Sequence, residues 1–287
     1  MQHSPYVIIS PMKNEERYVA QTLDSVVGQT APPLEWVIVN DGSTDRSPDI
    51  VSQYARQYPW IRLVHSNASK RSRGGHVVDL FYKGFEHIKA KHFDFIVKLD
   101  CDLSFAGDFF AVALQHLDDN PRLGVTSGIS HIMIDGQLVA EGAAPGHTLG
   151  ASKIYRYSCF QDIGGLVRSM GWDGIDEIKA RMLGWEARPI RELVVLHHRP
   201  EGKQLGTFAS GLERGRGSYF MGYHPMFLMA RVCRQILRPR HFVDGIAMFA
   251  GYTSALLKRE ERIPDSSFIN FLRKHQLRKL LMLKSEV

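Results

Sequence analysis

The stretch "DFIVKLDCDLSF", residues 94–105, joins an apolar run to a pair of carboxylates. Its first half is apolar and β-branched, which is typical of a strand covered on both faces. Asp100 and Asp102 stand where that strand should leave the core, and alternation places them on one side with Cys101 on the other. Two close carboxylates suit a hard divalent cation such as Mg²⁺ or Mn²⁺. An isolated pair can equally be a turn cap beside a solvated aspartate.

Short apolar runs alternate with amphipathic stretches along the first 125 residues. Strands are predicted at 6–10, 34–40, 61–66 and 94–100, and helices at 15–29, 47–58, 75–90 and 107–117. Ser47 is predicted as the N-cap of the second helix, with Pro48 at its first position. Strands that are apolar along their whole length are expected where helices cover both faces of a sheet. The pattern predicts an α/β fold with a doubly wound, mostly parallel sheet.

Polar clusters follow three of these strands, at 11–16, 40–45 and 100–102. The carboxyl ends of parallel strands meet at one edge of the sheet, and ligands bind in the crevice outside that edge. Asp41 could accept hydrogen bonds from a base or a ribose, and Gly42 permits close approach. The basic loop at 69–76 includes Arg73 and could hold phosphate. Each cluster alone could be an ordinary loop.

Three segments together resemble one protein family: "SPMKNEERYVAQTLDSVVGQT" (10–30), "EWVIVNDGSTD" (35–45) and "FIVKLDCDL" (95–103). They are similar to the N-terminal signature of the family 2 inverting glycosyltransferases, and the resemblance extends over residues 5 to about 200. It implies the glycosyltransferase A fold, the nucleotide-diphospho-sugar transferase type of α/β domain.

The resemblance also implies roles for individual residues. By this match the nucleotide sugar would be bound by Pro11, Glu15 and Asp41, and we assign Asp100 and the basic-loop residue Arg73 to the same site. The metal and the diphosphate would be served by Asp100 and Asp102, with Asp102 the more direct ligand. In this family the strand after the catalytic helix is followed by a histidine, and "LVVLHHRP" (193–200) offers His197 and His198. Only one of the two can face the site, and we assign His197 to the metal.

A catalytic base is implied in the second half of the domain. The family pattern there is Gly-Gly, a spacer, then Glu-Asp opening a helix that ends in Gly and an aromatic residue. The corresponding segment is "IGGLVRSMGWDGIDEIKARMLGW" (163–185), which contains no Glu-Asp pair. Spacing from Gly184 selects Asp173, whereas the acidic pair Asp176-Glu177 selects Asp176. We slightly favour Asp176, although either aspartate could instead cap the helix.

The function implied by the resemblance is a metal-dependent, inverting transfer of a sugar to an acceptor hydroxyl. The donor would be a nucleoside-diphosphate sugar, with UDP-sugars first, and Mg²⁺ or Mn²⁺ would be the cofactor. The acceptor would be a glycan or a lipid-linked molecule in cell-surface polysaccharide or glycan biosynthesis. Two alternatives remain, a nucleotidyltransferase and a non-catalytic nucleotide-sugar-binding protein. A nucleotidyltransferase would be expected to have a glycine-rich loop with Arg or Lys after the first strand, and the loop at 10–16 lacks this pattern.

The chain is predicted to divide into a catalytic domain at 1–204 and a helical extension at 205–287. The domain would consist of a nucleotide-sugar-binding half, 1–125, and an acceptor half, 126–204, with a hairpin around Asp135-Gly136. The extension has apolar helices edged by Arg and Lys. Such helices can lie on a membrane surface, or they can pack on the catalytic domain or on a second protomer. We favour peripheral membrane association.

Composition narrows the setting of this 287-residue chain. The formal net charge is +6, and the basic residues are dispersed, which gives little support to nucleic-acid binding. Three cysteines without metal-finger spacing favour a reducing compartment. The first residues become polar too soon for a signal peptide, and no uncharged apolar run has the length of a membrane span. The expected location is the cytoplasm, at the inner face of the membrane.

Overall fold

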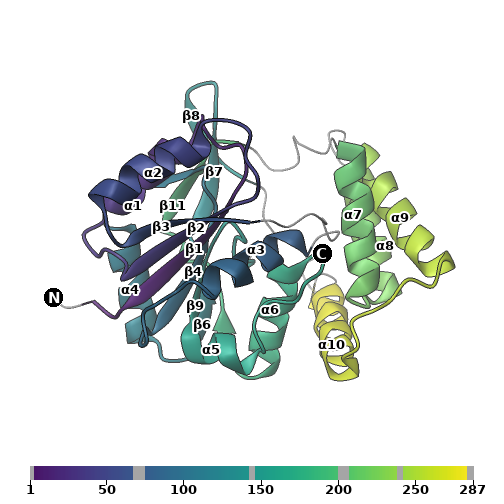
Figure 1. Ribbon diagram of the computed structural model, residues 1–287. Coiled ribbons are helices and arrows are strands. Elements are labelled where there is room, and N and C mark those ends of the chain that lie inside the picture. The colour runs from purple at the N-terminus through teal and green to yellow at the C-terminus, as the bar shows by residue number, and fades with distance from the viewer. Residues whose placement is uncertain (1–2, 67–74, 142–145, 200–206, 238–241, 283–287) are drawn as a thin grey trace.

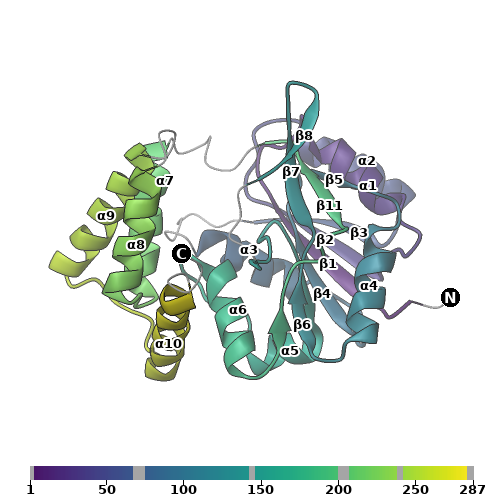
Figure 2. The ribbon, with the colours of Figure 1, turned by 180° about the vertical axis from the view of Figure 1, so that it is seen from behind.

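A computed structural model describes residues 3–66, 75–141, 146–199, 207–237 and 242–282. Figure 1 shows an α/β part that contains both sheets and, beside it, a group of helices, α7 to α10, formed by the end of the chain. The same arrangement is seen from behind in Figure 2.

The main sheet confirms the predicted fold class. Its strands, in spatial order, are β10 (Glu186–Ala187), β6 (Leu123–Thr126), β9 (Ser152–Arg156), β4 (Phe95–Leu99), β1 (Tyr6–Met12), β2 (Glu35–Asn40) and β3 (Ile61–His65). Neighbouring strands are parallel except at β9, which runs antiparallel to both β4 and β6. The carboxyl ends of β1, β2 and β4 therefore meet at one edge, as the sequence predicted.

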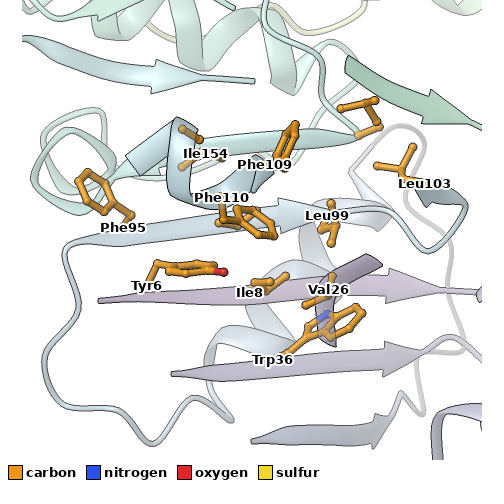
Figure 3. Close-up of a cluster of buried hydrophobic side chains, with 14 of the residues drawn as sticks. Tyr6, Ile8, Val26, Trp36, Phe95, Leu99, Leu103, Phe109, Phe110 and Ile154 are labelled. Atoms are coloured by element: carbon orange, nitrogen blue, oxygen red, sulfur yellow. The ribbon is translucent and has the colours of Figure 1, made fainter. Parts of the chain in front are cut away.

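Helices cover both faces of this sheet. One face packs on α1 (Val19–Val27), α2 (Ser47–Gln57) and α4 (Phe109–Asp119), and the other on α3 (His76–Phe85), α5 (Tyr157–Asp162) and α6 (Trp172–Met182). Alternate residues of β1 divide between the two cores, with Ile8 in the first and Ile9 in the second. Figure 3 shows the first core, where Trp36 and Phe110 lie between strands and helices. Both residues are almost completely buried.

A smaller second sheet was not predicted as a unit. Its order is β5 (Leu103–Phe105), β11 (Val194–His197), β7 (Ile129–Ile134) and β8 (Gln137–Ala140). The β7–β8 hairpin turns at Asp135 and Gly136, both with positive φ, as expected for this turn sequence. β11 pairs antiparallel with β5 and places His197 opposite Leu103. The second sheet thus brings a late segment of the chain beside Asp102.

Several predicted boundaries shift in the structure, and α1 and α3 are both shorter than predicted. Ser47 is the first residue of α2 instead of its N-cap, which is Arg46. The Ser47 hydroxyl instead accepts a hydrogen bond from the Glu15 amide at 2.7 Å. β1 continues through Pro11, which pairs with Val39, although the sequence predicted an end before it. Pro11 is tolerated there because the pairing of β1 with β4 ends at Ile9, so no donor is needed on that side.

The end of the chain is helical, as predicted. It comprises α7 (Thr207–Phe220), α8 (Pro225–Ile236), α9 (Phe242–Leu257) and α10 (Ser266–Met282). α10 packs on the α/β part, where Phe268 and Leu272 share a buried cluster with Ile175 of α6. Of the alternatives considered for the extension, packing on the α/β part is therefore observed for α10. In the described ranges, no helix is both long and apolar enough to cross a bilayer.

Candidate active site

Two carboxylates and one guanidinium form the centre of the strand-end cluster. Asp102 is buried, with 5% of its surface exposed, and Nη2 of Arg199 lies 3.2 Å from its Oδ2. The same Nη2 also donates to Oε1 of Glu15. Arg199 therefore neutralises two acidic groups that come from different strand ends. Arg199 was not predicted from the sequence, because its pairing depends on β11 lying beside β5.

A histidine completes the surroundings of Asp102. Nε2 of His197 is 3.5 Å from Oδ2 of Asp102, and its Nδ1 is 2.9 Å from Oε2 of Glu141. Burial would lower the pKa of His197, but its two carboxylate partners raise it to about 10. His198 turns away and lies 2.6 Å from the Ser104 hydroxyl. Of the two histidines, His197 is the one beside Asp102.

Asp100 and Asp102 have separate partners. β4 ends at Leu99, and the chain then turns. Oδ1 of Asp100 accepts a hydrogen bond from Lys98 at 2.6 Å. Burial and the Asp102 charge raise the pKa of Asp100 despite Lys98, whereas His197 and Arg199 lower that of Asp102 against burial. Cys101 is buried in the core, away from water.

Glu15 has one carboxylate oxygen without a partner among the described residues. The side chain is buried, and its Oε2 is covered but makes no hydrogen bond. Burial and the nearby Asp102 charge raise the pKa of Glu15 to about 7, although Arg199 opposes this. A buried oxygen of this kind costs free energy unless a donor or a cation supplies the missing contact. Glu15 is thus prepared for a further partner.

Asp41 follows the end of β2 and has Lys13 and His76 as neighbours. Its Oδ2 is 3.1 Å from Lys13 Nζ and 2.9 Å from His76 Nε2, the latter outside hydrogen-bond geometry. Burial would raise the pKa of Asp41, but His76 and Lys13 outweigh it and lower the value. Gly42 follows with a φ of 65°, so the backbone turns sharply there. Arg73 lies outside the described residues.

The two candidate bases differ in exposure although they lie one turn apart on α6. The Asp176 side chain is 1% exposed, and Lys153, itself fully buried, lies 3.0 Å from its Oδ1. Tyr155 also donates to Asp176. Burial raises the pKa of Asp176 to about 6, against the charge of Lys153. An acceptor molecule could reach this carboxylate only if the core opened.

Asp173 lies in the first turn of α6 and its side chain is 34% exposed. Its Oδ2 is 3.5 Å from Nε2 of His147, whose Nδ1 is 2.9 Å from Oε1 of Glu177. Burial would raise the pKa of Asp173, but His147 and Lys153 lower it to about 2. In turn, the two carboxylates raise the pKa of His147 to about 9 against the effect of burial. Asp173 is therefore an accessible, ionised carboxylate.

Two buried lysines connect the strand end to α6. Lys98 of β4 and Lys153 of β9 are directly opposite in the antiparallel register. Their ammonium groups lie 5.4 and 5.5 Å from the centre of the Trp172 ring. Lys98 pairs with Asp100, and Lys153 also donates to the main-chain carbonyl of Asp173. Each of these lysines interrupts an otherwise apolar run, "FIVKL" or "ASKIY". This pattern was the sequence signal for buried, paired lysines, and it was not used to predict the site.

The donor set around Asp102 fits a divalent cation. Nε2 of His197 lies 3.5 Å from Oδ2 of Asp102, and Glu141 holds the other ring nitrogen of His197, as carboxylates often do beside metal-bound histidines. The unpartnered oxygen of Glu15 belongs to the same cluster. In the described part of the chain, no three His, Cys, Asp or Glu side chains converge on one point. Waters and phosphate oxygens would therefore have to complete the shell.

The chain is similar to known glycosyltransferases. The model of the family described as "Glycosyl transferase family 2" matches residues 7–141. The "Putative glycosyltransferase EpsH" of Bacillus subtilis is 26% identical over 164 residues, which are 56% of this chain and 43% of that protein. The "Putative teichuronic acid biosynthesis glycosyltransferase TuaG" of the same organism is 30% identical over 113 residues, 35% of this chain and 45% of that protein. The matches thus span less than half of each relative.

Solved structures support the same fold at low sequence identity. A mannosyltransferase, PcManGT from Pyrobaculum calidifontis in complex with GDP-Man and Mn²⁺, has a TM-score of 0.59 and 18% identity, covering 91% of this chain and 77% of that one. S. aureus TarS 1–349 in complex with UDP-GlcNAc has a TM-score of 0.56 and 18% identity, covering 69% and 60%. At this identity the likeness establishes the fold alone, and it confirms the expected glycosyltransferase A type.

Proposed function

Because the model of glycosyl transferase family 2 matches residues 7–141, we propose that the chain is a metal-dependent, inverting glycosyltransferase. The donor is a nucleoside-diphosphate sugar, and the acceptor is a hydroxyl group of a glycan or of a lipid-linked molecule. Pro11, Glu15, Asp41, Arg73 and Asp100 form the nucleotide-sugar site in this proposal. The donors named for the two similar structures, GDP-Man and UDP-GlcNAc, are the first to test, with UDP-sugars preferred.

The observation that carries this proposal is the difference between two carboxylates, one in the cluster at the strand ends and one at the start of α6. Asp102, with its exchangeable partner Arg199, belongs to the cluster at the strand ends. Asp173, accessible and ionised, lies at the start of α6. Asp100, two residues before Asp102, is connected to the main chain of Asp173 through Lys98, Trp172 and Lys153. One group suits a leaving diphosphate and the other suits the acceptor hydroxyl.

Asp173 is the base in this mechanism, in place of Asp176. A general base must come within hydrogen-bond reach of the proton that it removes. Asp176 is enclosed by Lys153 and Tyr155, so its two oxygens hold the fold together. Asp173 exposes a third of its side chain, and its carboxylate makes a long ion pair, 3.5 Å, with His147. The greater exposure of Asp173 therefore favours it as the base, in agreement with the spacing from Gly184.

The reaction follows from these roles. Asp173 accepts the proton of the acceptor hydroxyl, and the hydroxyl oxygen forms a bond to the anomeric carbon from the face opposite the leaving group. The bond between that carbon and the diphosphate oxygen breaks, and the electron pair leaves with the nucleoside diphosphate. The anomeric configuration inverts, and the proton ends on Asp173. A divalent cation bound by Asp102 and His197, with Asp100 nearby, would neutralise the charge of the leaving diphosphate.

Membrane association is a second part of the proposal. The basic, apolar helices at the end of the chain support peripheral binding at the inner face of the membrane, where a lipid-linked acceptor would be met. A homo-oligomer formed through these helices is the other arrangement to test. The similarity to TuaG supports a role in cell-surface polysaccharide biosynthesis.

Binding of UDP-, GDP- and dTDP-sugars, measured calorimetrically with and without Mn²⁺, tests the proposal, together with release of the nucleoside diphosphate. We expect at least one donor to bind and to be hydrolysed slowly only when Mn²⁺ is present. Asp102→Ala should abolish the metal-dependent signal, while Asp118→Ala, an exposed change near the opposite edge, should not. Binding without turnover of any donor or acceptor would support the non-catalytic alternative. Release of diphosphate from a nucleoside triphosphate would instead indicate a nucleotidyltransferase.

A further inference from the structure

α9 presents an apolar face to solvent along its whole length. Its exposed side chains are Phe242, Val243, Ile246, Phe249, Leu256 and Leu257, each between 41% and 82% exposed. They recur at helical spacing, and the opposite face, with Ala247 and Gly251, is buried against α7. At the end of a helix that only contacts water, polar residues would ordinarily replace Leu256 and Leu257. A stripe of this length calls for a partner.

α8 contributes a second stripe on the same side of the molecule. Met226 is 65% exposed, Met229 45% and Leu237 81%. The two helices run antiparallel and touch where Gly245 faces Ile236 (Figures 1 and 2). When each helix is viewed from its own N-terminus, the exposed apolar side chains lie on the same rotational side of the residue that makes this contact. Because the helices are antiparallel, both stripes then face one way, and we call this surface the α8–α9 face.

Within α8 and α9 themselves, the exposed charge is positive. α8 contains Arg231 and Arg234 and no acidic residue. The only acidic residue of α9 is Asp244, which is buried and paired with Arg214 of α7. Exposed basic residues, Lys258 and Arg259, follow directly after α9, and Glu260 and Glu261 come only beyond them. The apolar surface is thus bordered by cations at both ends of the helix pair.

The position and the rigidity of the face also suit a flat partner. α9 is the outermost of the helices in Figures 1 and 2, and α7 separates it from the α/β part. α7 and α9 are in backbone contact, since a Cβ at Gly215 would lie 2.1 Å from the Met248 carbonyl and one at Gly251 2.1 Å from the Leu212 carbonyl. Such close packing holds α9 as a straight, preformed helix. No ordering of the backbone is needed before it binds.

We propose that the α8–α9 face docks on an anionic lipid bilayer, with both helices in the plane of the interface. Phe, Leu, Ile and Met side chains enter the acyl boundary, while Arg234, Lys258 and Arg259 contact lipid phosphates. A second copy of the chain is disfavoured as the occupant, because two such faces would bring like charges together. The inference deepens the membrane part of the proposed function and rests on it; it names the surface that carries the association.

Vesicle co-sedimentation of the full chain tests this surface. The probes are phosphatidylcholine vesicles with and without phosphatidylglycerol, at low and at high salt. The wild type should bind the anionic vesicles, and salt should weaken this binding. Ile246→Ser with Phe249→Ser should reduce the partition coefficient about tenfold or more, because two inserted side chains are lost. Arg234→Glu with Lys258→Glu should reduce binding to the anionic vesicles while sparing the neutral ones.

The matched control is Leu34→Ser with Leu183→Ser, which removes two equally exposed apolar side chains from the α/β part. It should bind as the wild type does. Equal binding by the Ile246/Phe249 variant, or wild-type binding that ignores lipid charge, would overturn the inference. So would sedimentation equilibrium showing a wild-type dimer that this variant converts into a monomer. Donor hydrolysis measured without vesicles separates the two proposals. Loss of vesicle binding with retained hydrolysis would bear on the α8–α9 face and not on the reaction. Retained vesicle binding with no hydrolysis would bear on the proposed reaction and not on the face.

Discussion

The cluster around Asp102 and the cluster around Asp176 both hold buried carboxylates, but they are neutralised differently. Asp102 is paired with Arg199, a side chain that is 29% exposed and that also serves Glu15. Asp176 is paired with Lys153, which has no exposed surface. Oε2 of Glu15 has no partner among the described residues, whereas both oxygens of Asp176 accept hydrogen bonds.

The difference separates exchangeable from permanent neutralisation. An exposed arginine can withdraw into water when a cation or a diphosphate arrives, at little cost in free energy. A fully buried lysine cannot leave without an uncompensated charge remaining in the core. Asp173 combines features of both clusters. Its main chain is held by Lys153, while its carboxylate reaches solvent. The strand-end cluster is therefore suited to ligand binding and the Asp176 cluster to holding α6 in place.

Asp173→Asn should have the largest effect. It removes the group that would accept the proton, and general-base catalysis contributes about 10²- to 10⁴-fold to a rate. Sugar transfer should fall by that factor, whereas Mn²⁺-dependent donor binding should be retained. The measurement is single-turnover transfer at saturating donor. If Asp176→Asn instead lowered transfer equally without loss of stability, the division between the two clusters would be wrong.

Lys153→Met should mainly affect stability. The change leaves Asp176 buried without its cation, and breaking such a pair costs about 3 to 5 kcal/mol. Urea unfolding measures this loss. Lys153→Met combined with Asp176→Leu should recover much of it, because Asp176 then leaves no charge behind, and the neighbouring Glu177 keeps His147 and Arg181 as partners. A single variant as stable as the wild type would mean that Asp176 is already protonated in the core.

Glu141→Gln should weaken the metal site without removing a direct ligand. Glu141 holds Nδ1 of His197, and loss of such an outer partner typically costs about 10- to 100-fold in metal affinity. Titration of Mn²⁺ by electron paramagnetic resonance gives the affinity directly. Glu192→Gln is the matched control, because Glu192 pairs with an exposed histidine, His116, away from Asp102. Equal affinities in both variants would place the metal elsewhere.

The smallest expected effect is on the pH dependence of stability. The pKa of His147 is raised from 6.5 to about 9 in the folded protein, so folding favours its protonated form. The resulting stabilisation is complete below about pH 6.5 and is lost as the pH rises through 9. With partial exposure, we expect about 2 kcal/mol to be lost over this interval. His147→Gln should lose less over the same interval, as followed by urea unfolding at both ends, and parallel pH profiles would contradict the assignment.

The sequence alone determined the fold class and most of the nucleotide-sugar half. Apolar runs that alternate with amphipathic helices depend on local burial, so β1 to β4 and their helices could be read directly. The position of Asp41 and Asp102 at the sheet edge followed from parallel strand order. The hairpin at Asp135-Gly136 was also predictable, because its turn requires positive φ.

Only the tertiary structure decided which carboxylates are accessible. Asp173 and Asp176 are one helical turn apart, and spacing could not distinguish them. Their difference arises because β9 inserts antiparallel beside β4 and places Lys153 under Asp176. Arg199 and Glu141 likewise reach the Asp102 cluster through pairing across the second sheet, over long sequence separations. Local sequence encodes burial and turn geometry, but the charge that neutralises a given aspartate depends on which distant strand packs beside it.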